Sequence, residues 1–281
     1  MNHAAAVRPA LEGIHFTDAG TGSPAIVFVH GWSCSHTDWD AQVAALSSHH
    51  RCIAIDLPGH GASARPREIT IAAMAEAVNA LVDHLGLDEV VLVGHSMGCR
   101  VSTQAWSAAR ARIRGIVHVD GSLLEGDPEA MVGRFKTQIA EQGADALLDR
   151  LYADFCVPAT PEALRQSIAR RRGGLDAGFF SELFLDFVRW DATHSRERLG
   201  RLDIPVMLIQ SSSLDASGRR VPLAQGETTP WTRAVAQRLP GARIVIVSGV
   251  GHFTMLEAPE RVTALIESFV HSLAECSHPG H

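Results

Sequence analysis

The chain has 281 residues, of which 46% are hydrophobic and 20% are charged, and its formal net charge at pH 7 is −6. This length is enough for one large domain with a sizeable core, or for a core that carries an insertion. The acidic balance argues against a general nucleic-acid or anionic-membrane surface, and no apolar stretch approaches membrane-spanning length. We therefore expect a soluble protein with no nucleic-acid or membrane partner, and the sequence leaves its oligomeric state open.

Cysteine usage and the first residues indicate the compartment. The five cysteines, at positions 34, 52, 99, 156 and 276, are widely scattered and form no C-x-x-C motif, which favours a reducing environment. The opening stretch MNHAAAVRPALEG has no basic segment followed by an apolar run, so no secretory signal is expected. Together these features predict a cytoplasmic protein.

Short apolar, β-branched runs alternate with helical patterns along the chain. This alternation predicts a doubly wound, mostly parallel sheet with helices on both faces. Residues 13–18 are expected to add an antiparallel strand at one edge. The expected parallel strands are 25–29, 52–55, 90–93, 113–119, 206–209 and 244–247, and the expected helices between most of them are 39–46, 71–85, 101–111 and 259–273.

The alternation is interrupted between residues 123 and 201, where the sequence shows no convincing strand. Its helical patterns fall at 128–142, 144–155, 161–171 and 179–190. About 80 residues of helix are too long for a crossover between neighbouring strands, whose helical connections usually need little more than a dozen residues. We expect a helical cap over the carboxyl ends of the strands, where open α/β sheets bind ligands, on a core of residues 1–122 and 202–281.

One helix of the expected cap, FFSELFLDFVRW, places three aromatic side chains on a single face: Phe180, Phe184 and Phe187. Two interpretations remain open. The stripe either packs against other cap helices, or it faces the ligand and makes the binding pocket apolar. In the second case these residues bind an apolar small-molecule substrate.

The stretch VVLVGHSMGCR, residues 90–100, contains a candidate nucleophile. A buried strand runs into a tight turn and then a helix, and glycines at 94 and 98 remove the Cβ atoms that would clash there. Ser96 would stand at the end of the strand and the start of the helix, where partial positive charge favours a developing anion. The pattern G-x-S-x-G in this context is a nucleophile elbow.

A serine hydroxyl needs a base, and His252 is the best candidate. It follows the last apolar strand in IVIVSGVGHF, at the sheet edge that carries the elbow. The base in turn needs an acid, for which two aspartates fit. Asp120 ends the strand GIVHVD, whereas Asp215 lies within a polar loop after IPVMLIQ. The rigid strand-end position favours Asp120.

Two backbone N–H groups are expected to stabilise an oxyanion. One belongs to Met97, which follows the serine, and the other to Trp32, in HGW after the strand AIVFV. The glycine turn DLPGHGAS, residues 56–63, is interpreted as structural. No metal site or cofactor is expected, because Cys276, His278 and His281 form only a terminal stretch.

The sequence resembles the α/β-hydrolase superfamily, in particular its capped lipase- and esterase-like members. The resemblance rests on HGW (30–32), DLPGHGAS (56–63), GHSMG (94–98) and GVGHF (249–253), in the usual order and spacing over most of the chain. The usual acid of the family follows the strand matching IPVMLIQ in a Gly-x-x-Asp turn. Here Ser211 replaces the glycine and Asp215 falls one place late, which strengthens Asp120, a position used by some members.

The resemblance implies a Ser-His-Asp serine hydrolase that cleaves an ester, thioester or lactone through an acyl-enzyme. Dehalogenase-like and epoxide hydrolase-like members carry Asp at the elbow, and Ser96 argues against both. Amide hydrolysis and carbon–carbon cleavage of a β-diketone-like substrate also remain open. A different class of alternative is a cofactor-independent dioxygenase that opens a 3-hydroxy-4-quinolone-type ring with a His–Asp pair. A further alternative is a non-catalytic small-molecule receptor.

Overall fold

The computed structural model describes residues 11–215 and 219–276. Residues 1–10 of the opening stretch, and His278 and His281 of the tail, lie outside the described residues. Among the described helices, none combines the length and the apolar composition needed to cross a membrane.

Seven strands of the described chain form one sheet in the order β1-β3-β2-β4-β5-β6-β9. Strand β1 pairs with β3 in antiparallel fashion, and every other neighbouring pair is parallel. The doubly wound, mostly parallel fold and the antiparallel edge strand are therefore confirmed. The strands are β1 Phe16–Ala19, β2 Ala25–Val29, β3 Cys52–Ile55, β4 Val90–His95, β5 Ile113–Val119, β6 Val206–Gln210 and β9 Arg243–Ile246.

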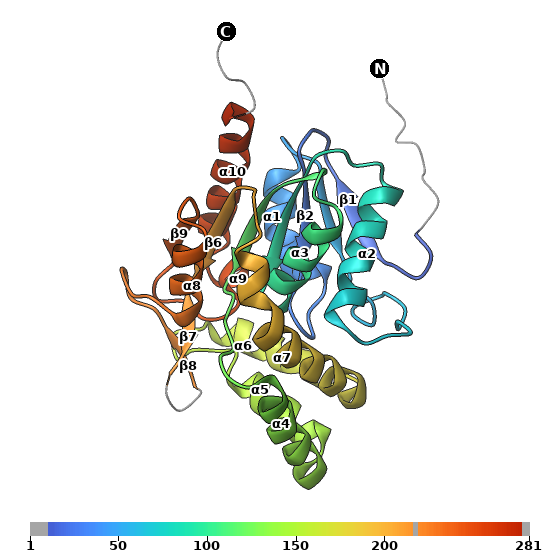
Figure 1. Cartoon of the computed structure of the whole chain (residues 1–281), viewed down its shortest axis with the longest axis vertical. Coiled ribbons are helices and arrows are strands. Elements are labelled where there is room, and N and C mark those ends of the chain that lie inside the picture. The colour runs from blue at the N-terminus through green and yellow to red at the C-terminus, as the bar shows by residue number, and fades with distance from the viewer. Residues whose placement is uncertain (1–10, 216–218, 277–281) are drawn as a thin grey trace.

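Helices cover both faces of the sheet (Figure 1). Alternate residues of β2 show why: Val27 packs into a core shared with α2 and α3, and Phe28 packs into a core shared with α1 and α10. A strand buried on both faces has a continuous apolar sequence, because side chains point to opposite faces in turn. These helices are α1 Asp40–Leu46, α2 Ile71–His84, α3 Met97–Ala108 and α10 Pro259–Cys276.

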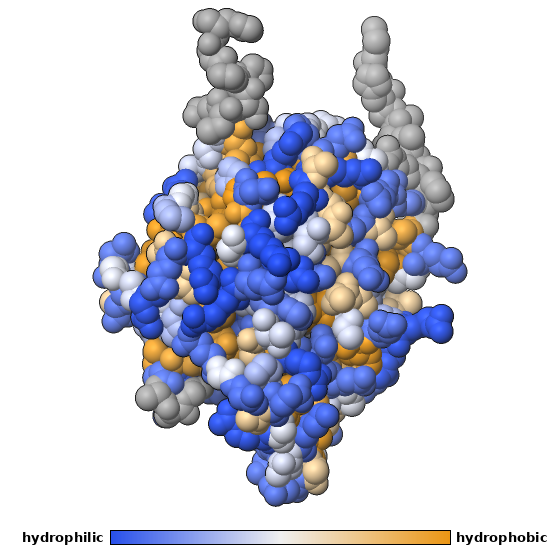
Figure 2. Space-filling model, in the orientation of Figure 1, coloured by the Kyte–Doolittle hydropathy of each residue, from blue (hydrophilic) through white to orange (hydrophobic). Residues whose placement is uncertain are grey.

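Helices alone occupy the stretch between β5 and β6, as the sequence indicated. They are α4 Pro128–Gln142, α5 Ala144–Ala153, α6 Glu162–Arg172 and α7 Ala177–Leu199. In Figure 1 they gather at one end of the sheet, away from the chain termini. Hydrophilic residues cover much of the face drawn in Figure 2, with hydrophobic residues in patches between them. Helix α7 extends nine residues beyond the expected end at 190, because its next helix-breaking residue is Gly200.

Five short elements were not expected from the sequence. Strands β7 (Ser212–Leu214) and β8 (Arg220–Pro222) form an antiparallel hairpin in the segment interpreted as a polar loop. Helix α8 (Pro230–Arg238) follows, with Thr229 as its N-cap and Pro230 at its first position. A 3-10 turn, η1 (His36–Trp39), and the short helix α9 (Thr254–Glu257) complete the described elements.

Candidate active site

The turn around Ser96 has the geometry that the glycine spacing predicts. Ser96 lies between β4 and α3 with φ 53° and ψ −115°, a conformation that L side chains rarely adopt. A Cβ atom at Gly94 would lie 2.3 Å from the carbonyl oxygen of Gly98, and one at Gly98 would lie 2.3 Å from that of Val29. Only glycine fits at either place, so the backbone can turn sharply and present Ser96 at the end of the strand.

Ser96, His252 and Asp120 form a chain of two hydrogen bonds. The Nε2 atom of His252 lies 3.0 Å from Ser96 Oγ, and its Nδ1 atom lies 2.7 Å from Asp120 Oδ2. Because an ionised carboxylate only accepts hydrogen bonds, Nδ1 carries the proton and Nε2 is left to accept one from Ser96. Burial, followed by the nearby charge of Arg220, lowers the pKa of His252 to about 4. The imidazole is therefore neutral at neutral pH.

Asp120 is held by donors from the end of the neighbouring strand β6. Its Oδ1 accepts from the backbone N–H groups of Ser211 and Ser212, at 2.9 and 2.8 Å, and from the Gln210 side chain at 3.0 Å. Burial alone would raise the pKa of Asp120, but the hydrogen bond from His252 and the surrounding charges outweigh it and lower the pKa to about 2. The carboxylate is ionised and fixed on both oxygens.

Of the two aspartates left open by the sequence, Asp120 is the one in contact with His252. Asp215 is exposed on the β7–β8 hairpin, where it accepts a hydrogen bond from the backbone N–H of Arg219 at 3.0 Å. The physical reason is that β6 ends at Gln210, and Ser211 and Ser212, which follow directly, place their backbone N–H groups beside Asp120. Asp120 follows β5, the strand adjacent to β6, so its carboxylate lies within reach of these donors.

Two further residues that sequence reasoning did not assign contact this group. Arg220 donates from Nη1 to Ser212 Oγ at 2.8 Å and lies 3.4 Å from Asp120 Oδ2, with its side chain 13% exposed. His95 places Nε2 2.8 Å from the backbone oxygen of His252, which ties the elbow to the loop that carries the base. The position of His95 inside the elbow motif was a usable signal, whereas nothing in the local sequence marks Arg220.

A cavity of about 590 Å³ opens directly onto Ser96 and His252. Its lining includes the two residues expected to provide oxyanion donors, Trp32 and Met97, and residues of α4, α5 and α7. Most of the side chains that these three helices contribute are apolar. The cavity therefore combines a serine and a histidine with a mainly apolar wall.

The aromatic stripe of α7 divides between two environments. Phe184 and Phe187 line the cavity, but Phe180 is absent from its lining. Phe180 is 5% exposed and packs edge-on against Trp32 and His60, with ring centres 5.6 and 5.0 Å apart. The expectation that Phe180 faces the pocket is wrong for this reason: it lies one helical turn before Phe184, where α7 meets the core loops.

The sequence matches the model of the alpha/beta hydrolase family over residues 26–265, which is most of the chain. The chain belongs to this family. It is thus an α/β-hydrolase enzyme, as the four motifs indicated.

Individual known proteins are similar to this chain at moderate identity. A pimeloyl-[acyl-carrier protein] methyl ester esterase of Neisseria meningitidis is 27% identical, over 87% of this chain and 92% of its own length. The dihydrolipoyllysine-residue acetyltransferase component of an acetoin cleaving system from Pseudomonas putida is 28% identical over 91% of this chain, which spans 65% of that protein. The structure of a thermophilic esterase from Thermogutta terrifontis matches with a TM-score of 0.75 at 26% identity, covering 92% of this chain and 93% of that one.

In this α/β-hydrolase, two groups of side chains bring atoms suited to metal binding within 4.8 Å of one another among the described residues. They are His15, His36 and Asp56, and His50, Glu267 and His271. Sequence reasoning found neither, because the members of each group come from distant segments.

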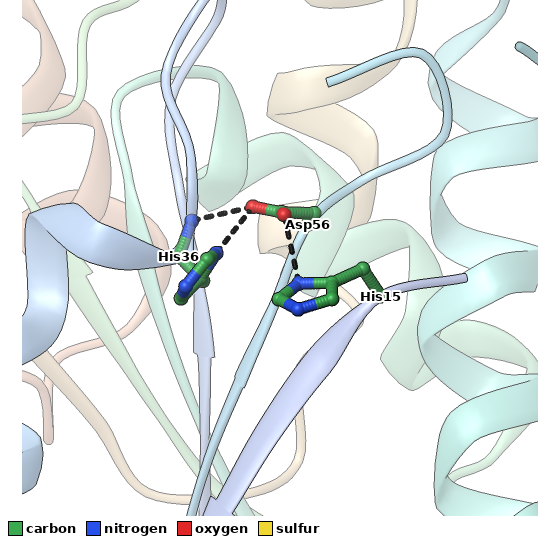
Figure 3. Close-up of side chains that lie close together, drawn as sticks. All are labelled: His15, His36 and Asp56. Carbon is green, nitrogen blue, oxygen red and sulfur yellow. Dashed lines mark hydrogen bonds and ion pairs between the residues drawn. The ribbon is translucent and has the colours of Figure 1, made fainter. Parts of the chain in front are cut away.

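In the first group both rings point at the carboxylate of Asp56 (Figure 3). Oδ1 of Asp56 accepts hydrogen bonds from the backbone N–H and from Nδ1 of His36, at 2.7 and 2.9 Å. Oδ2 accepts hydrogen bonds from Nδ1 of His15 and from the backbone N–H of Ala62, at 3.0 and 2.9 Å. Protein donors thus occupy both oxygens. A Cβ at Gly61 would lie 2.2 Å from this carboxylate, so the glycine turn 56–63 shapes the loop, as interpreted from the sequence.

Proposed function

We propose that this α/β-hydrolase is a serine hydrolase that cleaves an ester, thioester or lactone of an apolar small molecule. The observation that carries the proposal is the hydrogen-bonded chain from Ser96 through His252 to Asp120, with distances of 3.0 and 2.7 Å, at an apolar cavity. A serine needs such a base to become a nucleophile, and the base needs such an acid to hold its tautomer.

The proposed reaction proceeds in two halves. His252 Nε2 takes the proton of Ser96 while Oγ attacks the carbonyl carbon, and Asp120 stabilises the imidazolium that forms. His252 then gives the proton to the leaving alcohol or thiol as the bond to it breaks, which leaves an acyl group on Ser96. A water molecule activated by His252 attacks this acyl group and releases the carboxylic acid, and the proton returns to Ser96 Oγ.

The negative oxygen of each tetrahedral intermediate is assigned to the backbone N–H groups of Trp32 and Met97. Two features support this assignment. Met97 is the first residue of α3, so its N–H has no acceptor within the helix. Trp32 follows Gly31, and Gly31, Trp32 and Met97 all line the cavity beside Ser96.

The helical segment 123–201 is proposed as a cap on a core of residues 1–122 and 202–281. Supporting this division, α4, α5 and α7 contribute lining to the same cavity as Ser96. Phe184 and Phe187 are proposed to bind the apolar part of the substrate. A cytoplasmic setting is part of the proposal, and Cys34, Cys52, Cys99 and Cys156, which are all free, are consistent with it.

The test combines the variant Ser96→Ala with a serine-directed organophosphonate. Activity is measured on aryl esters of graded acyl length, beside oxygen uptake with 3-hydroxy-4-quinolones. We expect Ser96→Ala to lower kcat by roughly three or more orders of magnitude and to abolish labelling. The control is Ser107→Ala, because Ser107 lies near the C-terminal end of α3 and outside the cavity lining. A Ser96→Ala protein that keeps most of its activity would refute the acyl-enzyme.

A further inference from the structure

The cavity beside Ser96 has a charged part that the proposed chemistry does not use. Helix α4 turns one face toward it, formed by residues at positions 131, 134, 135 and 138. Arg134 lies on that face among apolar neighbours, and Arg150 lines the cavity from α5. In the whole lining there are three guanidinium groups, on Arg134, Arg150 and Arg220, and one carboxylate, on Asp154. This local excess of positive charge stands out in a chain whose net charge is −6.

The three arginines differ in how their charge is balanced. Arg220 lies beside the carboxylate of Asp120, 3.4 Å away. Arg134 and Arg150 are exposed, and within the described ranges 11–215 and 219–276 no carboxylate oxygen approaches either of them to 4.0 Å. Arg150 instead stands 5.7 Å from the centre of the Phe135 ring. Two cationic groups thus border an apolar cavity with their N–H donors free of acidic partners.

Several other arginines of the helices between β5 and β6 are paired with acidic side chains. Arg189 of α7 lies 2.9 Å from Glu129, and Arg172 of α6 lies 2.7 Å from Asp149. Pairing is therefore common on these helices, and Arg134 and Arg150 lack it. A guanidinium presents a planar fork of donors that matches a carboxylate in shape and charge.

We propose that Arg134 and Arg150 bind a carboxylate at the far end of the substrate. The inference rests on the proposed serine hydrolase function and names its substrate class: an ester or thioester whose apolar chain ends in a carboxylate, such as the half-ester of an aliphatic dicarboxylic acid. The chain of such a molecule fills the apolar cavity, its reactive carbonyl lies at Ser96, and its charged end meets the two guanidinium groups between α4 and α5.

The experiment compares two nitrophenyl esters of equal chain length, the hexanoate and the mono-adipate. They differ in that the second ends in a carboxylate. In the double variant Arg134→Met/Arg150→Met, we expect the ratio of kcat/KM for the adipate to that for the hexanoate to fall by about tenfold. Ion pairs of exposed groups contribute modestly, and such binding appears mainly in KM. Raising the ionic strength should lower the same ratio in the unmodified enzyme.

The control is Arg114→Met, which removes one positive charge on β5, outside the cavity, where Arg114 pairs with Glu89. An unchanged ratio in the double variant would overturn the inference, and so would an equal fall in the control, because the effect would then be one of net charge. If neither ester is hydrolysed and Ser96 is not labelled, the serine hydrolase proposal fails. Calorimetry on Ser96→Ala then decides the inference alone: tighter binding of the adipate ester that the arginine changes remove supports it, and equal binding of both esters overturns it.

Discussion

Replacement of Asp120 by asparagine should inactivate the enzyme through the tautomer of His252. The Oδ1 position of Asp120 faces four donors, among them the backbone N–H groups of Ser211 and Ser212. An asparagine must therefore keep its oxygen there and turn its NH2 group toward His252. The Nδ1 atom then has to accept instead of donate. The ring proton moves to Nε2, which can no longer take the proton of Ser96.

The expected loss in kcat is about four orders of magnitude, the effect of an amide at the acid position of a serine protease triad. Stability should fall as well. The difference between the ordinary pKa of 3.8 and the value of about 2 in the folded protein corresponds to about 2 kcal/mol of stability, since one pKa unit is about 1.4 kcal/mol. Because the folded-state pKa is the lower one, this contribution is present above about pH 3.8 and is lost as the pH falls toward 2.

The assay is kcat on an aryl ester at neutral pH, with a thermal melt to correct for any unfolded fraction. Asp215→Asn is the matched control, because Asp215 is exposed on the β7–β8 hairpin, and it should stay close to the unmodified enzyme in both measurements. A folded Asp120→Asn protein within tenfold of the original kcat would refute the reasoning, as would a larger loss in Asp215→Asn.

Two other predictions concern the pocket and the pH profile. Phe184→Ala removes a ring that lines the cavity, and burial of such a group is worth about 1.5–3 kcal/mol. We expect a loss of about ten- to a hundredfold in kcat/KM on bulky or long-chain esters and less on acetate esters, whereas Phe180→Ala, outside the cavity, should lower the melting temperature without this selectivity. Equal losses on both ester types in Phe184→Ala would contradict the assignment. For the unmodified enzyme, kcat/KM should fall as the pH drops through about 4, because His252 must be neutral to act as a base. Arg220→Met removes a charge that lowers this pKa, so its acid limb should move to higher pH, and an unmoved limb would argue against the role of Arg220.

The sheet and the elbow followed from short-range features of the sequence. The strands were recognisable because a parallel strand covered on both faces is mostly apolar, and 25–29, 52–55 and 113–119 match the observed strands residue for residue. Ser96 and His252 could be predicted for a related reason. Each follows a strand of the parallel sheet, and the carboxyl ends of parallel strands meet at one edge.

Features that depend on contacts between distant segments needed the tertiary structure. The choice of Asp120 in preference to Asp215 depends on where β6 delivers its donors, 91 and 92 residues away along the chain. The position of Arg220 depends on the β7–β8 hairpin, whose strands have three residues each and are too short to carry a periodic pattern. Helical spacing places Phe180, Phe184 and Phe187 on one face of α7, but that face meets two surroundings along its length. Sequence spacing fixes which residues share a face, and only packing decides what each part of that face touches.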